Sequence, residues 1–289
     1  MEPAADSAAI ENSRRLEWTE GRYRYSVQRR NGAAVYSVTD GTETAEIPLG
    51  YALGRSSRTW VFESNGRYFE SRVSYFPSID GLGLTPGTPR PIPATVQQAL
   101  GRSLETFEAR DCFGCHATGA RKGDTFQLES YENGVQCEAC HGPGAEHAAR
   151  ASRGLARPGM IRSLRGMDAD RVNDLCGSCH RTAEMALALN LSGVNSIRFQ
   201  PYRLSLSRCY TNDRRIACVA CHNPHAAAAK GDRPYDAKCL ACHGSSRQCK
   251  VAKEACTSCH MPRYELPDAR QVFTDHFIRI VRDGRRPPG

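Results

Sequence analysis

The chain has 289 residues, of which 40% are hydrophobic and 24% charged, and a formal charge of +8. This length allows one or two domains, and the composition excludes a disordered chain. No apolar run approaches the roughly 18–20 residues that cross a bilayer, so we expect no transmembrane helix.

The N-terminal part is predicted to be β-rich. Residues 1–13 are small and polar, and we expect them to form a disordered tail. In residues 14–93, Asn31-Gly32 separates two runs of alternating apolar and polar residues, which is the strongest short signal for a hairpin. Ser64-Asn65-Gly66 marks a second hairpin. Residues 81–93 contain four prolines and three glycines, so we expect a linker there.

Helical patterns follow the linker. We expect helices at 95–110, at 168–175 with Asp168 as N-cap, and at 182–190. The fold class is therefore predicted to be α+β, with a small N-terminal antiparallel β domain. A mostly helical or irregular domain is expected to occupy residues 94–289.

Cysteine usage distinguishes this second region, because all 14 cysteines lie between Cys112 and Cys259. Twelve of them form six C-x-x-C pairs, and histidine follows every pair directly. In chain order, the motif residues are Cys112, Cys115 and His116, then Cys137, Cys140 and His141, then Cys176, Cys179 and His180, then Cys218, Cys221 and His222, then Cys239, Cys242 and His243, and finally Cys256, Cys259 and His260.

The C-x-x-C-H motif is typical of covalent attachment of haem c. Its two thiols add to the two vinyl groups of the porphyrin, and the histidine is then the proximal ligand of the iron. Structural zinc is an alternative, but zinc sites do not require a histidine after every pair. A thioredoxin-like redox pair is another, but it would predict a single motif in a βαβ context. We therefore expect six covalent haems.

The spacing of the motifs predicts how such haems pack. Six motifs lie within residues 112–260, a span of 149 residues. This is too little chain to surround each haem with its own apolar shell. We therefore expect the haems to form much of the core, to pack against one another and to conduct electrons.

Only three histidines remain as distal ligands: His147, His225 and His276. At most three haems can therefore have two histidine ligands from this chain. His225 is too close to His222 in sequence to reach the opposite face of the same porphyrin. The other haems would need a methionine, an unusual ligand, a histidine from another chain, or an open site.

Cys209 and Cys249 lie outside the motifs. In an oxidising compartment the simplest expectation is a disulfide between them. Two buried thiols, or a thiolate that binds haem iron, are the alternatives.

The sequence resembles the multihaem cytochromes c of the cytochrome c-552/c-554 domain type. The resemblance is carried by residues 137–144 with His147, by Cys218–His222 followed by Asn223-Pro224-His225, by Cys256–His260 with Met261-Pro262, and by Thr274–Ile278. It implies that His147, His225 and His276 are distal ligands. It also implies an exported electron carrier with paired haems, although the best-known relatives have four haems rather than six.

We therefore expect an electron-transfer protein of the periplasm or the cell exterior, with no catalytic residues. Its partners would be other cytochromes or a quinol-linked donor. Each haem adds a charge of about −1 to −2, so the holoprotein would be near neutral and nucleic acid is not an expected partner. The alternative is an enzyme with an open axial site that acts on nitrite, hydroxylamine or a sulfur compound such as tetrathionate. Export requires a signal peptide, and none is visible at residues 1–6.

Overall fold

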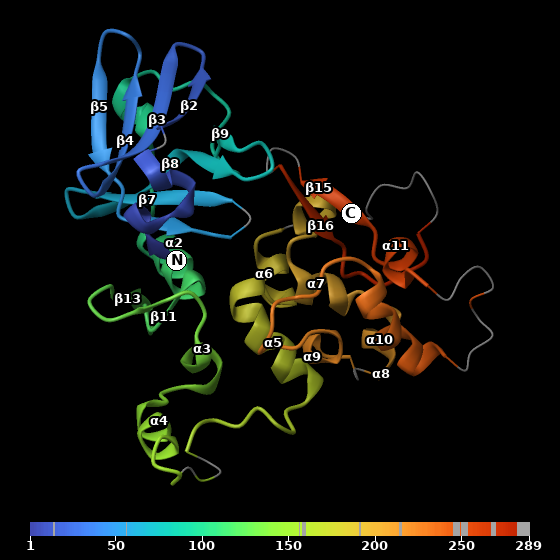
Figure 1. Ribbon diagram of the computed structural model, residues 1–289. Helices are drawn as coiled ribbons and strands as arrows, with labels where there is room; N and C mark the ends of the chain where they lie inside the picture. Colours follow the sequence, from blue (N-terminus) through green and yellow to red (C-terminus); the bar gives the residue numbers. More distant parts are fainter. Residues whose placement is uncertain are drawn as a thin grey trace. The chain divides into compact units, whose positions relative to one another are not determined.

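The computed structural model describes residues 1–13, 15–55, 57–155, 157, 160–190, 192–213, 216–244, 249, 254–266 and 270–281. The chain divides into two compact units (Figure 1). The first comprises Met1–Ile161 and the short segment up to Arg270, and the second comprises Arg162–Leu266 and the segment from Gln271 onward. The first unit therefore holds two of the C-x-x-C-H motifs and the second holds four.

A four-stranded antiparallel sheet in the first unit has the order β2-β3-β4-β5. Its strands are β2 (Arg15–Glu20), β3 (Tyr23–Arg30), β4 (Ala33–Thr39) and β5 (Thr44–Pro48). In the β3–β4 hairpin Arg30 pairs with Ala33, so Asn31-Gly32 forms the two-residue turn. This hairpin and its continuation into β5 confirm the sequence prediction.

The second sheet of this unit has the path β1-β6-β7-β8-β10, with β9 also paired to β8. Its strands are β1 (Glu2–Pro3), β6 (Tyr51–Leu53), β7 (Arg58–Ser64), β8 (Arg67–Phe76), β9 (Gly81–Leu84) and β10 (Gly101–Ser103). The β7–β8 hairpin turns at Asn65-Gly66, as predicted. The expected linker is in part the strand β9, so only the residues after Leu84 connect β9 to the helices.

Residues 1–13 are not a loose tail. They form β1 and two 3₁₀ helices, η1 (Ala4–Asp6) and η2 (Ala8–Ser13), and Ala4 and Ile10 are fully buried. Ala4 also donates its backbone N–H to Gly50 O at 3.0 Å. The prediction of disorder weighed polarity alone and missed these two apolar side chains, which pack into the core.

The apolar core of the first unit consists of two clusters of buried side chains. The larger includes Tyr25, Tyr36, Trp60 and Phe62, and the smaller surrounds Phe113. Burying such aromatic side chains contributes roughly 1.5–3 kcal/mol each. The fully buried residues of both clusters lie between Ala4 and Ala120, so this part of the chain has an interior of its own.

The single helix expected at 95–110 is instead two helices with a strand between them. α1 (Val96–Leu100) is capped by the Thr95 side chain, and α2 (Thr106–His116) begins with a capping box between Glu105 and Glu108. Gly101 interrupts the helix with a φ of 153°. A Cβ at this position would lie 2.0 Å from Glu70 O, so only glycine allows β10 to pair with β8.

Short elements complete the first unit. They are β11 (Ala117–Thr118) paired with β14 (Glu132–Asn133), β12 (Arg121–Lys122) paired with β13 (Thr125–Phe126), and the helices α3 (Cys137–His141) and α4 (Ala145–Ala151). Neither α3 nor α4 contains a buried residue.

The second unit is mostly helical, which confirms the α+β class. Its elements are α5 (Ala169–His180), α6 (Ala183–Ala188), η3 (Gly193–Ser196), α7 (Gln200–Ser205), α8 (Arg208–Asp213), α9 (Cys218–Cys221), α10 (Arg233–His243), α11 (Cys256–His260), β15 (Arg263–Leu266) and β16 (Gln271–Thr274). Asp168 caps α5 as predicted, and Thr182 caps α6. Within the described residues, no helix is long and apolar enough to cross a membrane.

The second unit buries little apolar surface. Its buried apolar residues, among those described, are Val172, Ala186, Ile197, Phe199, Leu204 and Leu266. No large cluster of buried apolar residues forms in its described part, in contrast to the first unit.

Candidate haem-attachment sites

Every C-x-x-C-H motif lies at the C-terminal end of a helix. The motif histidines are the last residues of α2, α3, α5, α10 and α11, whereas His222 is the C-cap of α9. Residues three and four apart share one face of a helix. The helical turn therefore presents both cysteines and the histidine of each motif on one side.

The motif cysteines are accessible to different degrees. Cysteine outside a disulfide is normally among the most buried residue types, yet none of the twelve is fully buried here. Thiols that remain this open fit the covalent attachment of a large group. The exposed ones are Cys137, Cys179, Cys242 and Cys259, and the half-buried ones are Cys112, Cys115, Cys140, Cys176, Cys218, Cys221, Cys239 and Cys256.

The first unit carries the first two motifs in different surroundings. On α2, Cys112 packs against the smaller apolar cluster, and burial raises its pKa to about 11. Its partner in the motif, Cys115, is half-buried. On α3, which has no buried residue, Cys137 is exposed and Cys140 is half-buried. For Cys115 and Cys140, as for the other motif cysteines, the thioether bond to haem stays a prediction.

In the second unit, the third and fourth motifs meet through α5 and α9. Asn173, on α5, accepts hydrogen bonds at Oδ1 from the backbone N–H of Cys218 (2.9 Å) and from its thiol (3.0 Å). Its Nδ2 donates to Ile216 O at 3.3 Å. Because Asn173 precedes Cys176 by three residues, about one helical turn, its bonds to Cys218 bring the first cysteines of these two motifs close together.

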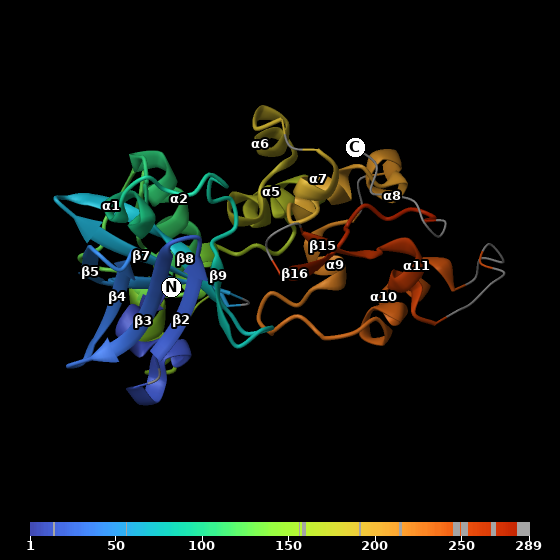
Figure 2. The ribbon, with the colours of Figure 1, turned by 90° about the horizontal axis from the view of Figure 1, so that it is seen from above.

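The fifth and sixth motifs meet in the same way through α10 and α11, which lie side by side in Figures 1 and 2. Asp236, on α10, accepts hydrogen bonds from the backbone N–H groups of Ala255 (2.8 Å) and Cys256 (2.9 Å). The hydrogen bond from the Cys256 N–H, with that from the Ala255 N–H, lowers the pKa of Asp236 against the opposing effect of burial. Because Asp236 precedes Cys239 by three residues, these bonds bring Cys239 and Cys256, the first cysteines of the two motifs, close together.

Asn173 and Asp236 occupy equivalent positions. Each stands three residues before the first cysteine of its own motif and holds the backbone N–H of the first cysteine of the next motif. We call these two residues the clasp residues. They divide the second unit into two similar cassettes, α5–α9 and α10–α11.

His222 and His276 approach each other beside a cavity. Their ring centroids are 6.1 Å apart and the rings are inclined by 31°. A cavity of about 410 Å³ is lined by residues that include Cys221, His222 and Tyr235. Burial lowers the pKa of His222, and it lowers the pKa of His276 to about 4. Both rings are therefore neutral at pH 7, as binding to iron requires.

Several of these histidines have one ring nitrogen engaged. His276 Nδ1 lies 3.0 Å from Thr274 O, and His260 Nδ1 lies 3.1 Å from Arg279 O. Histidines that bind metals typically donate their second N–H in this way, which fixes the tautomer and the orientation of the ring. The arrangement leaves Nε2 of each ring as the nitrogen that can bind iron.

His147 and His225 are placed differently. His147 lies on α4, and its Nδ1 is buried without a hydrogen-bond partner. A buried polar nitrogen without a partner is costly, and coordination to iron would satisfy it. His225 is exposed in the turn after His222, where its backbone N–H donates to Asn223 Oδ1 at 3.0 Å.

The chain therefore fits haem c by three observations: accessible motif thiols, neutral histidine rings beside a cavity, and an orphaned nitrogen at His147. Among the described residues, no group of three or more His, Cys, Asp or Glu side chains converges as a set of metal ligands. The Cys209–Cys249 disulfide stays a prediction.

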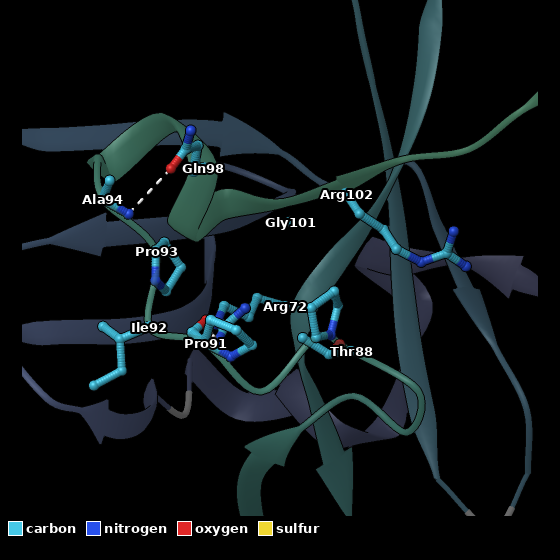
Figure 3. A pocket seen from close by; sticks show the side chains of 10 residues that line it. Arg72, Thr88, Pro91, Ile92, Pro93, Ala94, Gln98, Gly101 and Arg102 are labelled. Carbon is cyan, nitrogen blue, oxygen red and sulfur yellow. Dashed lines mark hydrogen bonds between the residues drawn. The ribbon is translucent and has the colours of Figure 1, made fainter.

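Another cavity, of about 350 Å³, lies in the first unit beneath the segment after β9 (Figure 3). Its lining includes Arg72 and Arg102. These guanidinium groups already pair with carboxylates, Arg72 with Glu20 at 2.6 Å and Arg102 with Glu70 at 2.8 Å. We therefore assign no anion site to this cavity.

Sequence reasoning missed the clasp residues and a buried ion pair between Arg203 and Asp275. The shared position of Asn173 and Asp236, three residues before a C-x-x-C pair, was a signal that could have revealed the clasps. Arg203 had no such signal, because its partner is 72 residues away in the chain.

Residues 93–142, which include the first two motifs, match the family described as cytochrome c554 and c-prime. The chain is also 24% identical over 202 residues to the multiheme cytochrome MtrA of Shewanella baltica (strain OS185). That match covers 63% of this chain and 54% of the relative, so it spans about half of the relative's length. No solved structure matches the chain. Taken with the motifs on their helices, these similarities support a multihaem cytochrome c with covalently bound haem.

Proposed function

We propose that this chain is a hexahaem cytochrome c that passes electrons along closely packed haems in the periplasm or outside the cell. The observation that carries the proposal is the contact that each clasp residue makes with the next motif. Asn173, one helical turn before Cys176, binds Cys218, and Asp236, one turn before Cys239, binds Cys256. Because each cysteine would hold the edge of a porphyrin, neighbouring cysteines bring two cofactors together. A pair of adjacent redox centres is what a conducting chain needs.

Haem c, once bound, supplies one-electron chemistry at its iron. The residues of this chain would attach the group and bind its iron. The twelve motif cysteines would form the thioether bonds, and the six motif histidines would bind the irons from the proximal side.

The distal ligands would be His147, His225 and His276. For His276 the geometry supports a specific pairing with His222. The ring centroids of His222 and His276 lie 6.1 Å apart and both rings are neutral at pH 7, so the two imidazoles would be able to bind the same iron.

The proposed location follows from the chemistry of haem attachment, and the proposed partners follow from the redox function. Haem c is attached on the outer side of the cytoplasmic membrane, so the protein would be exported. Its partners would be redox proteins, either other cytochromes or a quinol-linked donor. The similarity to a multiheme cytochrome supports redox partners of this kind.

A pyridine haemochrome assay combined with intact mass tests the haem count. We expect six covalent haems in the matured protein. Replacing Cys176 and Cys179 together with alanine should lower the count to five, whereas Cys209→Ala should leave it at six. A colourless protein whose mass reveals zinc and no tetrapyrrole would refute the proposal.

Electron paramagnetic resonance distinguishes an electron carrier from an enzyme. For an electron carrier, nitrite, hydroxylamine and tetrathionate should leave the spectrum of the oxidised protein unchanged. A high-spin signal that shifts when one of these compounds is added would instead support an open axial site and catalysis.

A further inference from the structure

A buried cluster of charges lies in the second unit, beside His276. Asp275 is fully buried and accepts two hydrogen bonds from Arg203, at 2.8 Å from Nε and 2.8 Å from Nη2. Arg203 itself is 1% exposed. Arg279 Nη1 adds a third contact to Asp275, at 2.7 Å, and both guanidinium groups lie against the ring of Phe277, 5.5 and 4.6 Å from its centroid.

Such a cluster is poorly explained as a source of stability. Removing charges from water is costly, and a buried ion pair seldom adds net stability over apolar residues of similar size. The geometry is nevertheless well defined, because three hydrogen bonds from two guanidinium groups and one from the Phe277 N–H hold the Asp275 carboxylate.

The cluster fixes the backbone on both sides of His276. Asp275 Oδ1 accepts the N–H of Phe277 at 3.0 Å. Ser207 Oγ donates to His276 O at 3.3 Å and accepts the N–H of Ile278 at 2.9 Å. With Nδ1 of His276 facing Thr274 O, the ring that approaches His222 has little freedom to turn.

The same segment reaches the last motif. Arg279 donates its N–H to His260 O at 3.2 Å, and its carbonyl faces His260 Nδ1 at 3.1 Å. Arg279 is also bound to Asp275 through its side chain. One carboxylate thus anchors the residues that orient His276 and His260.

We propose that the Arg203–Asp275–Arg279 cluster positions the histidine ligands of two haem irons. It would fix His276 as a ligand of one iron, and it would orient His260, the ligand of another, through the Arg279 carbonyl. This inference rests on the proposed function, because it takes His276 and His260 to be ligands. Arg203, Asp275 and Arg279 are positioning residues, since they would act through the histidines rather than touch the iron.

Asp275→Asn in the matured holoprotein tests the proposal, because it removes the charge and keeps the size of the side chain. In electron paramagnetic resonance, the low-spin signal of one haem should convert in part to high spin. In a redox titration, two components should shift while the others stay in place. A tenfold weaker binding of His276 to ferric iron corresponds to a rise of about 59 mV in the potential of that haem.

Two further variants complete the design. Arg203→Lys keeps the charge but loses the bidentate contact, and it should shift the same two components by less. Glu20→Gln is the matched control, because it breaks another buried ion pair, with Arg72, in which the Glu20 and Arg72 side chains are 11% and 5% exposed. It should leave the spin states and potentials unchanged.

The outcomes distinguish failure of the positioning role from failure of the ligand assignment of His276. If Asp275→Asn and Arg203→Lys lower the melting temperature but change neither spin state nor potential, the cluster is only structural and the inference is overturned. If Asp275→Asn does not mature, Arg203→Lys decides by the same criterion. His276→Ala tests the proposed ligand itself: if it changes no haem signal, the ligand assignment fails and this inference with it. If His276→Ala changes the signal and both cluster variants do not, only the positioning role fails.

Discussion

The two units of this chain differ in how many apolar side chains they bury. Residues 4–120 bury aromatic and aliphatic side chains in two clusters, with Trp60, Tyr25 and Tyr36 fully buried. The described part of the second unit buries few apolar side chains, and it instead holds its helices with polar contacts such as Asn173–Cys218 and Arg203–Asp275. From this comparison we expect the first unit to be stable through its own residues and the second to depend on the haems that its motifs would bind.

The largest expected effect comes from preparing the chain without haem. We expect the β-sheets of the first unit to keep their structure and the helices α5–α11 to lose theirs, because the apolar surface that would cover them is missing. Hydrogen exchange followed by mass spectrometry should find protected amides in β3 and β8 and none in α5. Equal protection of both units would show that the second unit folds without haem, contrary to the comparison.

Core truncation in the first unit should have a large but local effect. Trp60 is fully buried, so Trp60→Ala should cost about 3–5 kcal/mol of stability. The visible spectrum and the potentials of the haems in the second unit should not change. Denaturation followed by Trp18 fluorescence measures the first unit, and Soret absorbance follows the haems. A substantial change in haem potentials would contradict the independence of the two interiors.

Loss of a clasp residue should have a smaller effect within the second unit. Asn173→Ala leaves the backbone N–H of Cys218, in a half-buried residue, without its partner, and loss of such a hydrogen bond costs about 0.5–1.5 kcal/mol. We expect faster hydrogen exchange in α9 and no change in the first unit. Asp174→Ala is the matched control, because Asp174 is the exposed neighbour on the same helix. Equal exchange rates in both variants would show that the clasp does not stabilise α9.

The smallest effect concerns Glu70 in the first unit. Burial raises the pKa of Glu70, while Arg102 acts to lower it. The folded state therefore retains a proton that the unfolded state releases at lower pH. The contribution of Glu70 to stability should be full below its ordinary pKa of 4.5 and should fall as pH rises through the raised pKa.

Glu70→Gln should remove this dependence, which thermal unfolding measured between pH 4 and 7 would detect as a difference from the unchanged chain. Glu46→Gln is the control, because the ion pair of Glu46 with Arg30 is about half exposed. An identical pH profile for Glu70→Gln and the unchanged chain would show that burial of this carboxyl does not affect the pH dependence of stability.

The sequence predicted those parts of the fold that depend on local signals. Asn31-Gly32 and Asn65-Gly66 turn the chain as expected, and Asp168 caps α5. Gly101 was not recognised as a helix break, because its φ of 153° is required by the distant strand β8. The burial of Ile10 was missed for a similar reason, since tertiary packing rather than local pattern determines it.

The candidate sites likewise divide into features that a local pattern defines and features that depend on tertiary contacts. The six motifs were visible in the sequence because spacing alone defines them. The proximity of His276 to His222 could not be derived from spacing, since 54 positions separate them in the numbering. The partners of Asp275 likewise became visible only in the folded chain.

The clasps also bear on the order of assembly. Synthesis delivers α5 before α9 and α10 before α11, so each clasp residue already stands on its helix when the motif that it holds emerges. The first cassette nevertheless receives His276, beside His222, and Asp275, the partner of Arg203, only from the segment that is synthesised last. The clasps can therefore form early in synthesis, whereas the contacts of that C-terminal segment close the second unit at the end.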